Sequence, residues 1–170
     1  IKTHLTDQRY TQLVQTGPVV SITTVCLQTR ALVVWSTKPV AGGSGYISKT
    51  VRNAEQLRLA VLASASQPVF MTPVKVDFND ATGPEKDFQY ADGGLRAYAG
   101  VDMALDNGAD EIFAVLMAAQ KPAVDAAVLN TLFPILERTI DIFSTDVADN
   151  DVVRLDERQA FVRYLQAVHA

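Results

Sequence analysis

Cysteine and histidine are scarce in this chain. The single cysteine, Cys26, excludes an internal disulfide, and the two histidines, His4 and His169, lie near opposite ends. Without paired Cys or His residues, the usual zinc-binding spacings are absent. We therefore expect no disulfide, no bound metal and no cofactor.

Basic clusters and long apolar runs are absent as well. The net charge is -4, and Lys and Arg are scattered along the chain, so nothing marks a surface for a nucleic-acid backbone. The longest apolar stretches fall far short of the roughly 20 residues that span a bilayer, and the N-terminus has no basic-then-apolar signal layout. We expect a soluble protein that does not bind nucleic acid. Cytoplasmic and secreted locations both stay open.

The composition fits one globular domain. The chain has 170 residues, of which 48% are hydrophobic and 20% charged, enough for one substantial core and too few to argue for two. It begins with Ile1 rather than Met, so we expect the natural start of the gene product to lie upstream.

Apolar spacing and chain breakers predict the elements of the first half. A capping box of Asn53 and Gln56 favours a helix that starts there. The predicted elements are a helix over 6–16, a hairpin of strands over 19–27 and 31–35, a mobile loop over 38–50 and a helix over 53–66.

The second half alternates strands and helices. Gly108 suits the end of a short helix, because glycine enters the left-handed region cheaply. The predicted elements are a strand over 74–78, a turn over 79–84, a strand over 88–90, a helix over 101–107, a strand over 112–117 covered on both faces, and helices over 124–145 and 156–168, with a kink or break at Pro134.

This alternation predicts an α/β layered domain, in which chemistry gathers in loops beyond strand ends. Asp92 falls in such a loop, and Gly93 and Gly94 follow it directly. Two glycines let the backbone approach a ligand or a neighbouring side chain closely. An ordinary Asp-Gly turn, in which the carboxylate bonds to nearby backbone, is the alternative.

Four segments in a fixed order carry a resemblance. The hairpin 19–36, the Ala-rich helix and Pro-Phe stretch 60–74, the Asp-Gly-Gly segment 90–96 and the Gly-Ala-Asp-Glu segment 108–116 resemble, in order and approximate spacing, patatin-like phospholipases. The resemblance implies an α/β fold with a three-layer α/β/α sheet. It assigns all of 1–170 to the C-terminal portion of one such domain, with the sheet core over 19–117 and closing helices over 123–170.

The family resemblance also implies a chemistry. Patatin-like enzymes hydrolyse lipid esters, as phospholipases A do, with a Ser-Asp dyad and no histidine. Asp92 would be the dyad carboxylate, and Gly93 and Gly94 would set its orientation. The implied partners are a lipid ester substrate and peripheral contact with a membrane.

The nucleophile elbow of the family, Gly-x-Ser-x-Gly, is missing. The nearest match centres on Ser44, but it lacks the flanking strand and helix and lies downstream of the expected position, so a loop serine is favoured. Cys26 sits in an apolar strand and fits a packing role. The acidic residues Asp146, Asp149 and Asp151 lack the glycine and glutamate of a calcium loop, which favours a solvated helix end.

We therefore expect a missing N-terminal segment or a partner chain to supply the serine and the oxyanion loop, and these residues to be inactive alone. After Arg96, residues 97–100 replace the Asn or Asp and proline usual in the family, which leaves the loop shape open. Two alternatives remain: a non-catalytic patatin-like module that binds lipid or protein, and a different α/β protein whose Asp-Gly-Gly is a turn.

Overall fold

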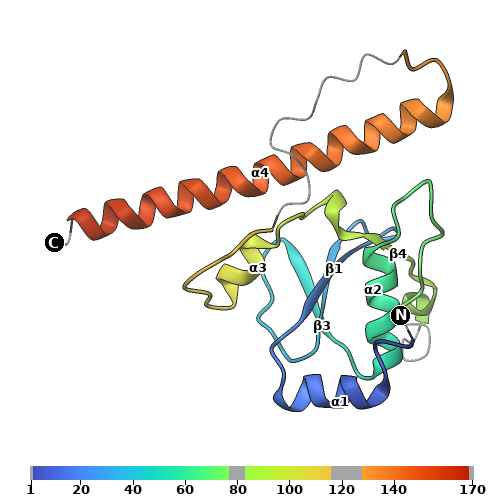
Figure 1. Cartoon of the computed structure of the whole chain (residues 1–170), viewed down its shortest axis with the longest axis horizontal. Helices are drawn as coiled ribbons and strands as arrows, with labels where there is room; N and C mark the ends of the chain where they lie inside the picture. The colour runs from blue at the N-terminus through green and yellow to red at the C-terminus, as the bar shows by residue number, and fades with distance from the viewer. Residues whose placement is uncertain (1, 77–82, 116–127, 169–170) are drawn as a thin grey trace.

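The computed structural model describes residues 2–76, 83–115 and 128–168 of the chain (Figure 1). Four strands form one sheet, and helices lie on both sides of it. In chain order the elements are α1 (Asp7–Thr16), β1 (Ser21–Cys26), β2 (Leu32–Ser36), β3 (Tyr46–Thr50), α2 (Ala54–Ser64), the 3-10 helix η1 (Gly83–Asp87), β4 (Tyr90–Asp92), the 3-10 helix η2 (Gly93–Leu95), α3 (Val101–Asp106) and α4 (Leu132–Val168).

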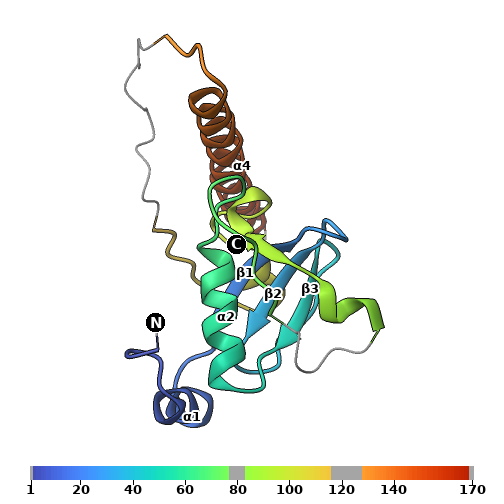
Figure 2. The same ribbon diagram turned by 90° about the vertical axis from the view of Figure 1, so that its right-hand side faces the viewer.

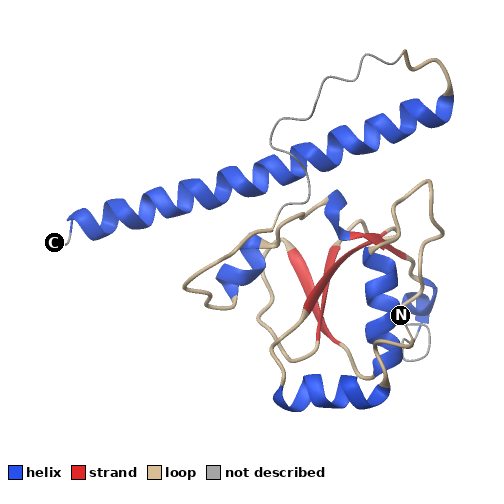
Figure 3. Ribbon diagram, viewed as in Figure 1, coloured by secondary structure: helices blue, strands red, loops and turns tan. Residues whose placement is uncertain are grey.

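The sheet is mixed, with strand order β3-β2-β1-β4. The predicted hairpin is confirmed, because β1 and β2 pair antiparallel, and β4 pairs antiparallel with the other edge of β1. Figure 3 shows the strands side by side, with α2 running beside them. The register places Asp92 opposite Thr24 of β1, so Asp92 closes the last pair at this edge of the sheet.

The mobile loop predicted over 38–50 is wrong in its second half, where β3 pairs parallel with β2 in the register Leu32↔Tyr46 to Ser36↔Thr50. The proline and glycines are confined to residues 37–45, which carry the chain back to the start of β2. The polar composition of the whole segment hid the β-prone Tyr46–Thr50, because parallel pairing leaves no local turn signal.

The main core lies between the sheet and α2 (Figure 2). Trp35 packs edge-to-face on Tyr90 at a centroid distance of 5.2 Å, and its indole Nε1 donates to Thr24 Oγ1 at 2.9 Å. The predicted cap of α2 is confirmed, since Asn53 Oδ1 accepts from Gln56 N at 2.8 Å. A buried aromatic pair with its polar atom bonded fixes the centre of the sheet.

A smaller cluster covers the opposite face, where Met103 of α3 packs with Val25, Leu32 and Val34. Helices therefore lie on both faces of a mixed sheet, and the α/β fold class is confirmed. None of the helices among the described residues combines the length and the apolar character needed to cross a bilayer.

Two predictions for the C-terminal half are wrong. Residues 112–115 of the predicted buried strand form no strand, and Phe113 and Val115 are 82% and 86% exposed. The two predicted helices are a single helix, α4, which runs without a break through the predicted gap over 146–155. Pro134 does not interrupt it, because this residue stands in the first turn, where its missing N–H has no intrahelical acceptor to lose.

Some predictions lie wholly or partly outside the described residues. Residues 77–82, which hold the end of the predicted strand 74–78 and most of the predicted turn 79–84, are among them, as are residues 116–127 and His169. Of the predicted strand 74–78, the described part forms an isolated antiparallel bridge between Val74 and Tyr90.

Candidate active site

Asp92 ends β4 and is the N-cap of η2, at the point where the chain turns away from the sheet. Its backbone N–H donates to Ser66 O at 3.0 Å, which ties the end of β4 to the residue that follows α2. Its Oδ1 accepts from Gly94 N at 2.8 Å. The side chain is half-buried, and Oδ2 has no hydrogen-bond partner among the residues that the structure describes.

The two glycines after Asp92 have different roles. Gly93 is buried against β1, and a Cβ there would lie 2.5 Å from the carbonyl carbon of Thr23. Gly94 supplies the N–H that holds Asp92, and a Cβ there would lie 3.2 Å from Asp92 Oδ1. Gly93 therefore has the close backbone approach that only glycine allows, whereas a side chain at position 94 would press on the Asp92 carboxylate itself. The catalytic role of Asp92 stays a prediction.

The loop that follows the glycines is held by α4. Asp151 Oδ2 accepts from Tyr98 N at 2.9 Å and from Ala99 N at 2.8 Å. Figure 1 shows α4 crossing the part of the molecule that contains η2 and α3. Sequence reasoning missed this role of Asp151, because a contact across 52 residues leaves no local pattern.

The acidic residues Asp146, Asp149 and Asp151 lie in the interior of α4, so the predicted helix end is wrong. Asp146 and Asp149 are exposed, whereas Asp151 is half-buried under the loop. Within the described residues no group of three or more His, Cys, Asp or Glu side chains could hold a metal ion.

A cavity of about 370 Å³ lies between the start of β2, the start of β3, the loop 96–100, α3 and α4. Asp102 of α3 closes one side of it by accepting from Arg154 at 3.0 Å and from Arg158 at 3.1 Å. Burial raises the pKa of Tyr46 in this cavity, and the hydrogen bond that its hydroxyl donates to Asp106 raises the pKa further. Asp92 is not among the residues that line the cavity.

The structure separates Ser44 from Asp92. Ser44 lines that cavity and precedes β3, whereas Asp92 ends β4, at the opposite edge of the sheet. Three strand spacings of about 4.8 Å place these edges roughly 14 Å apart. A direct hydrogen bond of ~2.6–3.2 Å between them is therefore excluded, which agrees with a loop serine.

Cys26 is 2% exposed and belongs to the cluster of buried residues between the sheet and α2. Its packing role is confirmed. The signal was local, since an isolated cysteine inside an apolar strand is typical of a small core side chain.

Comparisons with known proteins identify the family. The protein-family model described as patatin-like phospholipase matches residues 1–105. The matched region holds the whole sheet, Asp92 and its two glycines, and it ends inside α3. No curated protein and no solved structure matches the chain. This chain therefore belongs to the patatin-like phospholipase family.

Proposed function

We propose that this chain contributes Asp92 to a Ser-Asp dyad that hydrolyses lipid esters, as a phospholipase A does. The observation that carries the proposal is the family match over residues 1–105, which includes an aspartate at a strand end followed by two closely packed glycines. In this role Asp92 takes the serine proton as the hydroxyl attacks the ester carbonyl. An acyl-enzyme forms, and water then releases the fatty acid.

The surroundings of Asp92 support a positioned base. Gly94 N–H fixes one carboxylate oxygen, and the backbone bond to Ser66 fixes the strand end that carries the side chain. Oδ2 has no partner among the described residues and is the atom we assign to the serine hydroxyl. A base must be held in orientation within hydrogen-bond reach of the proton that it removes.

We place the nucleophile outside residues 1–170. In the described parts of the chain, no serine hydroxyl bonds to the Asp92 carboxylate. Ser66 Oγ donates to Leu62 O at 2.7 Å, and the hydroxyls of Ser21 and Ser36 share a 2.7 Å hydrogen bond. The serine and the N–H groups that stabilise the oxyanion would come from an upstream segment or a partner chain, and residues 1–170 alone would be inactive.

The test is turnover of a soluble short-chain ester by these residues alone and by the whole polypeptide that the gene encodes. We expect activity only in the whole polypeptide, and a loss of at least about 100-fold in the Asp92→Asn variant. Asparagine keeps the acceptor for Gly94 N–H and removes only the basic charge. Asp110→Asn, at an exposed position, is the matched control. Full turnover by the Asp92→Asn variant contradicts the proposal.

A non-catalytic module that binds lipid or protein is the second candidate. The observation in its favour is that the described cavity excludes Asp92, whose Oδ1 is bonded locally, as in an ordinary Asp-Gly turn. An upstream Gly-x-Ser-x-Gly preceded by a glycine-rich loop favours the enzyme, and a gene without one favours the binding module.

A further inference from the structure

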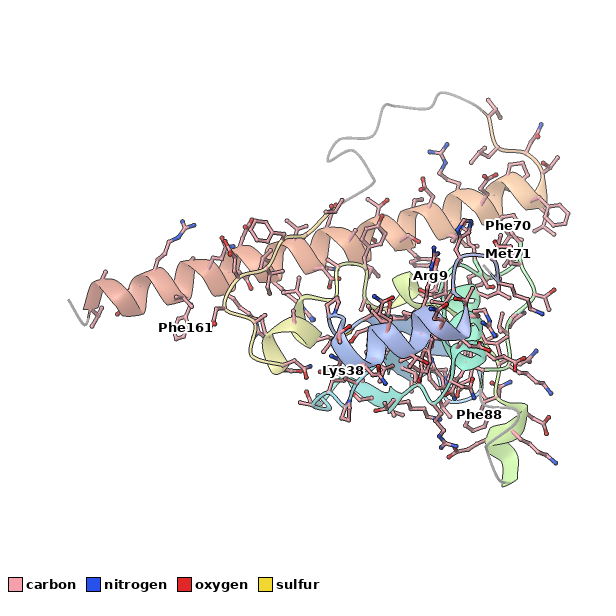
Figure 4. All side chains as sticks on the ribbon, turned by 60° about the horizontal axis from the view of Figure 1, so that its bottom comes forward. Arg9, Lys38, Phe70, Met71, Phe88 and Phe161 are labelled. Carbon is pink, nitrogen blue, oxygen red and sulfur yellow. The ribbon has the colours of Figure 1, made fainter. Side chains whose placement is uncertain are left out.

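Three consecutive apolar side chains stand exposed in the segment between α2 and β4. Val69, Phe70 and Met71 are 58%, 44% and 55% exposed, and no charged residue occurs between Arg58 and Lys75. Figure 4 shows Phe70 and Met71 at the edge of the molecule, near one end of α4 and far from Phe161. We call Val69, Phe70 and Met71 the apolar tip.

The apolar tip has a defined and strained backbone. Val69 has φ +76°, a left-handed conformation that is unusual for a β-branched residue. Met71 N donates to Gln67 O at 3.0 Å, and Pro68 and Pro73 restrict the chain on either side. Strain of this kind persists where the surrounding structure enforces it, and such positions cluster at functional sites.

Both ends of this segment are bonded to the strand that carries Asp92. Ser66 O accepts from Asp92 N at 3.0 Å, and Val74 and Tyr90 exchange two backbone hydrogen bonds of 2.8 Å each. Whatever holds the apolar tip therefore also holds the Asp92 end of β4.

The exposed area of the apolar tip and its lack of charge indicate which kind of partner it binds. Its exposed side chains offer roughly 300 Å², well below the ~800 Å² that each partner buries in a stable protein interface. A small uncharged tip can bind a lipid surface, because its apolar side chains become buried among the acyl chains. We infer that the apolar tip inserts into a lipid surface and so holds Asp92 at that surface; this rests on the proposed lipid hydrolase function.

The experiment is sedimentation of the whole natural polypeptide with neutral phosphatidylcholine vesicles. We expect Phe70→Ser with Met71→Ser to lower vesicle partition roughly tenfold or more, and the binding of the unmodified protein to survive about 0.5 M NaCl. Phe161→Ser is the matched control, since Phe161 is 61% exposed but lies far from the apolar tip. An equal loss in the Phe161→Ser variant, or no vesicle binding by the unmodified protein, overturns the inference.

A second variant guards against misfolding of the first. Phe70→Trp keeps the apolar character, and Trp35, the single tryptophan of residues 1–170, is fully buried, so the spectrum of the unmodified polypeptide is subtracted as the background. We expect its emission to shift to the blue when vesicles are added; an unchanged spectrum contradicts insertion. A fall in oligomer mass on Phe70→Ser with Met71→Ser, without loss of vesicle binding, would instead assign the tip to a second copy.

Soluble-ester turnover separates this inference from the proposed function. If turnover depends on Asp92 but the protein binds no vesicles, insertion of the apolar tip is contradicted and the proposed hydrolase function stands. If the protein binds vesicles through the apolar tip but shows no turnover, the hydrolase function is contradicted and the lipid-binding module stands.

Discussion

Asp92 is positioned by two backbone groups, Ser66 O and Gly94 N–H, and by the packing of Gly93 on Thr23 of β1. The turn that follows the strand therefore sets the direction of the Asp92 side chain, and this turn can pack on β1 because Gly93 has no Cβ. The glycines limit which substitutions the site tolerates.

Gly93→Ala tests this close approach. The added methyl group meets backbone of Thr23, which cannot rotate away, so we expect a loss of about 1–3 kcal/mol in the free energy of unfolding. Urea denaturation followed by circular dichroism measures the change. Gly42→Ala is the control, because nothing lies within 4 Å of a Cβ at that position. Equal stability of the two variants contradicts the packing described at Gly93.

Tyr10 predicts an alkaline loss of stability. Burial raises its pKa above 10.0, so the unfolded chain loses this proton at lower pH than the native protein. The contribution of Tyr10 to the free energy of unfolding should therefore be constant below about pH 10 and fall as the pH rises beyond it. Denaturant midpoints measured on either side of that pH check the direction.

Tyr10→Phe should reduce that alkaline fall. It also removes the hydrogen bond that the Tyr10 hydroxyl donates to Val51 O at 3.0 Å, which costs about 1 kcal/mol at neutral pH. Tyr164→Phe, at a position 63% exposed, is the control and should change neither quantity. If the free energy of unfolding of the Tyr10→Phe variant falls as steeply above about pH 10 as that of the unmodified protein, the assignment to Tyr10 is contradicted.

At the scale of elements, α4 is attached to the rest of the molecule through polar contacts. Asp151 accepts from Tyr98 N and Ala99 N, and Asp102 of α3 accepts from two arginines of the helix. The loop after Asp92 thus rests on a helix that begins 40 residues further along the chain.

Asp151→Ala should loosen that attachment. It leaves two half-buried N–H groups without their acceptor, so we expect a loss of about 1–3 kcal/mol and faster amide exchange at Tyr98 and Ala99. Asp149→Ala, at an exposed position on the same helix, should leave both amides protected. Unchanged exchange in the Asp151→Ala variant would show that α4 does not hold the loop.

Local sequence patterns correctly predicted the elements that neighbouring residues in the chain determine. The cap at Asn53, the β-prone hairpin and the glycine at Gly108, with φ +78°, each stand in the structure as predicted. β3 was missed because it pairs parallel with β2, so no tight turn joins the two strands and marks their pairing in the sequence. The strand over 112–117 was predicted from apolar composition alone, which does not specify what would cover it.

The residues of the candidate site likewise fall into those that a sequence motif reveals and those that only the fold brings together. Asp92 and its glycines stand out in the sequence as a motif, whereas Ser66 and Asp151 are joined to this region only by the fold. The sequence could not predict the role of either residue, since contacts across 26 and 53 positions leave no spacing to recognise.

At the scale of the whole molecule, much apolar surface is uncovered. Several large apolar side chains of α4 are more than half exposed, as are Phe113 and Val115. Large amounts of exposed apolar surface mark proteins that associate. We expect residues 1–170 alone to self-associate, with a mass by light scattering that rises with concentration. A monodisperse monomer over a wide concentration range would contradict this expectation.

The central claim is that Asp92 acts as the base for a serine that residues 1–170 do not supply. Its most direct test is the rate at which a serine-directed phosphonate labels the whole polypeptide, compared with the Asp92→Asn variant. We predict labelling of an upstream serine or of a partner chain, at least about 100-fold slower in the variant. Equal labelling rates in the two proteins, or labelling of a serine within residues 1–170, would contradict the claim.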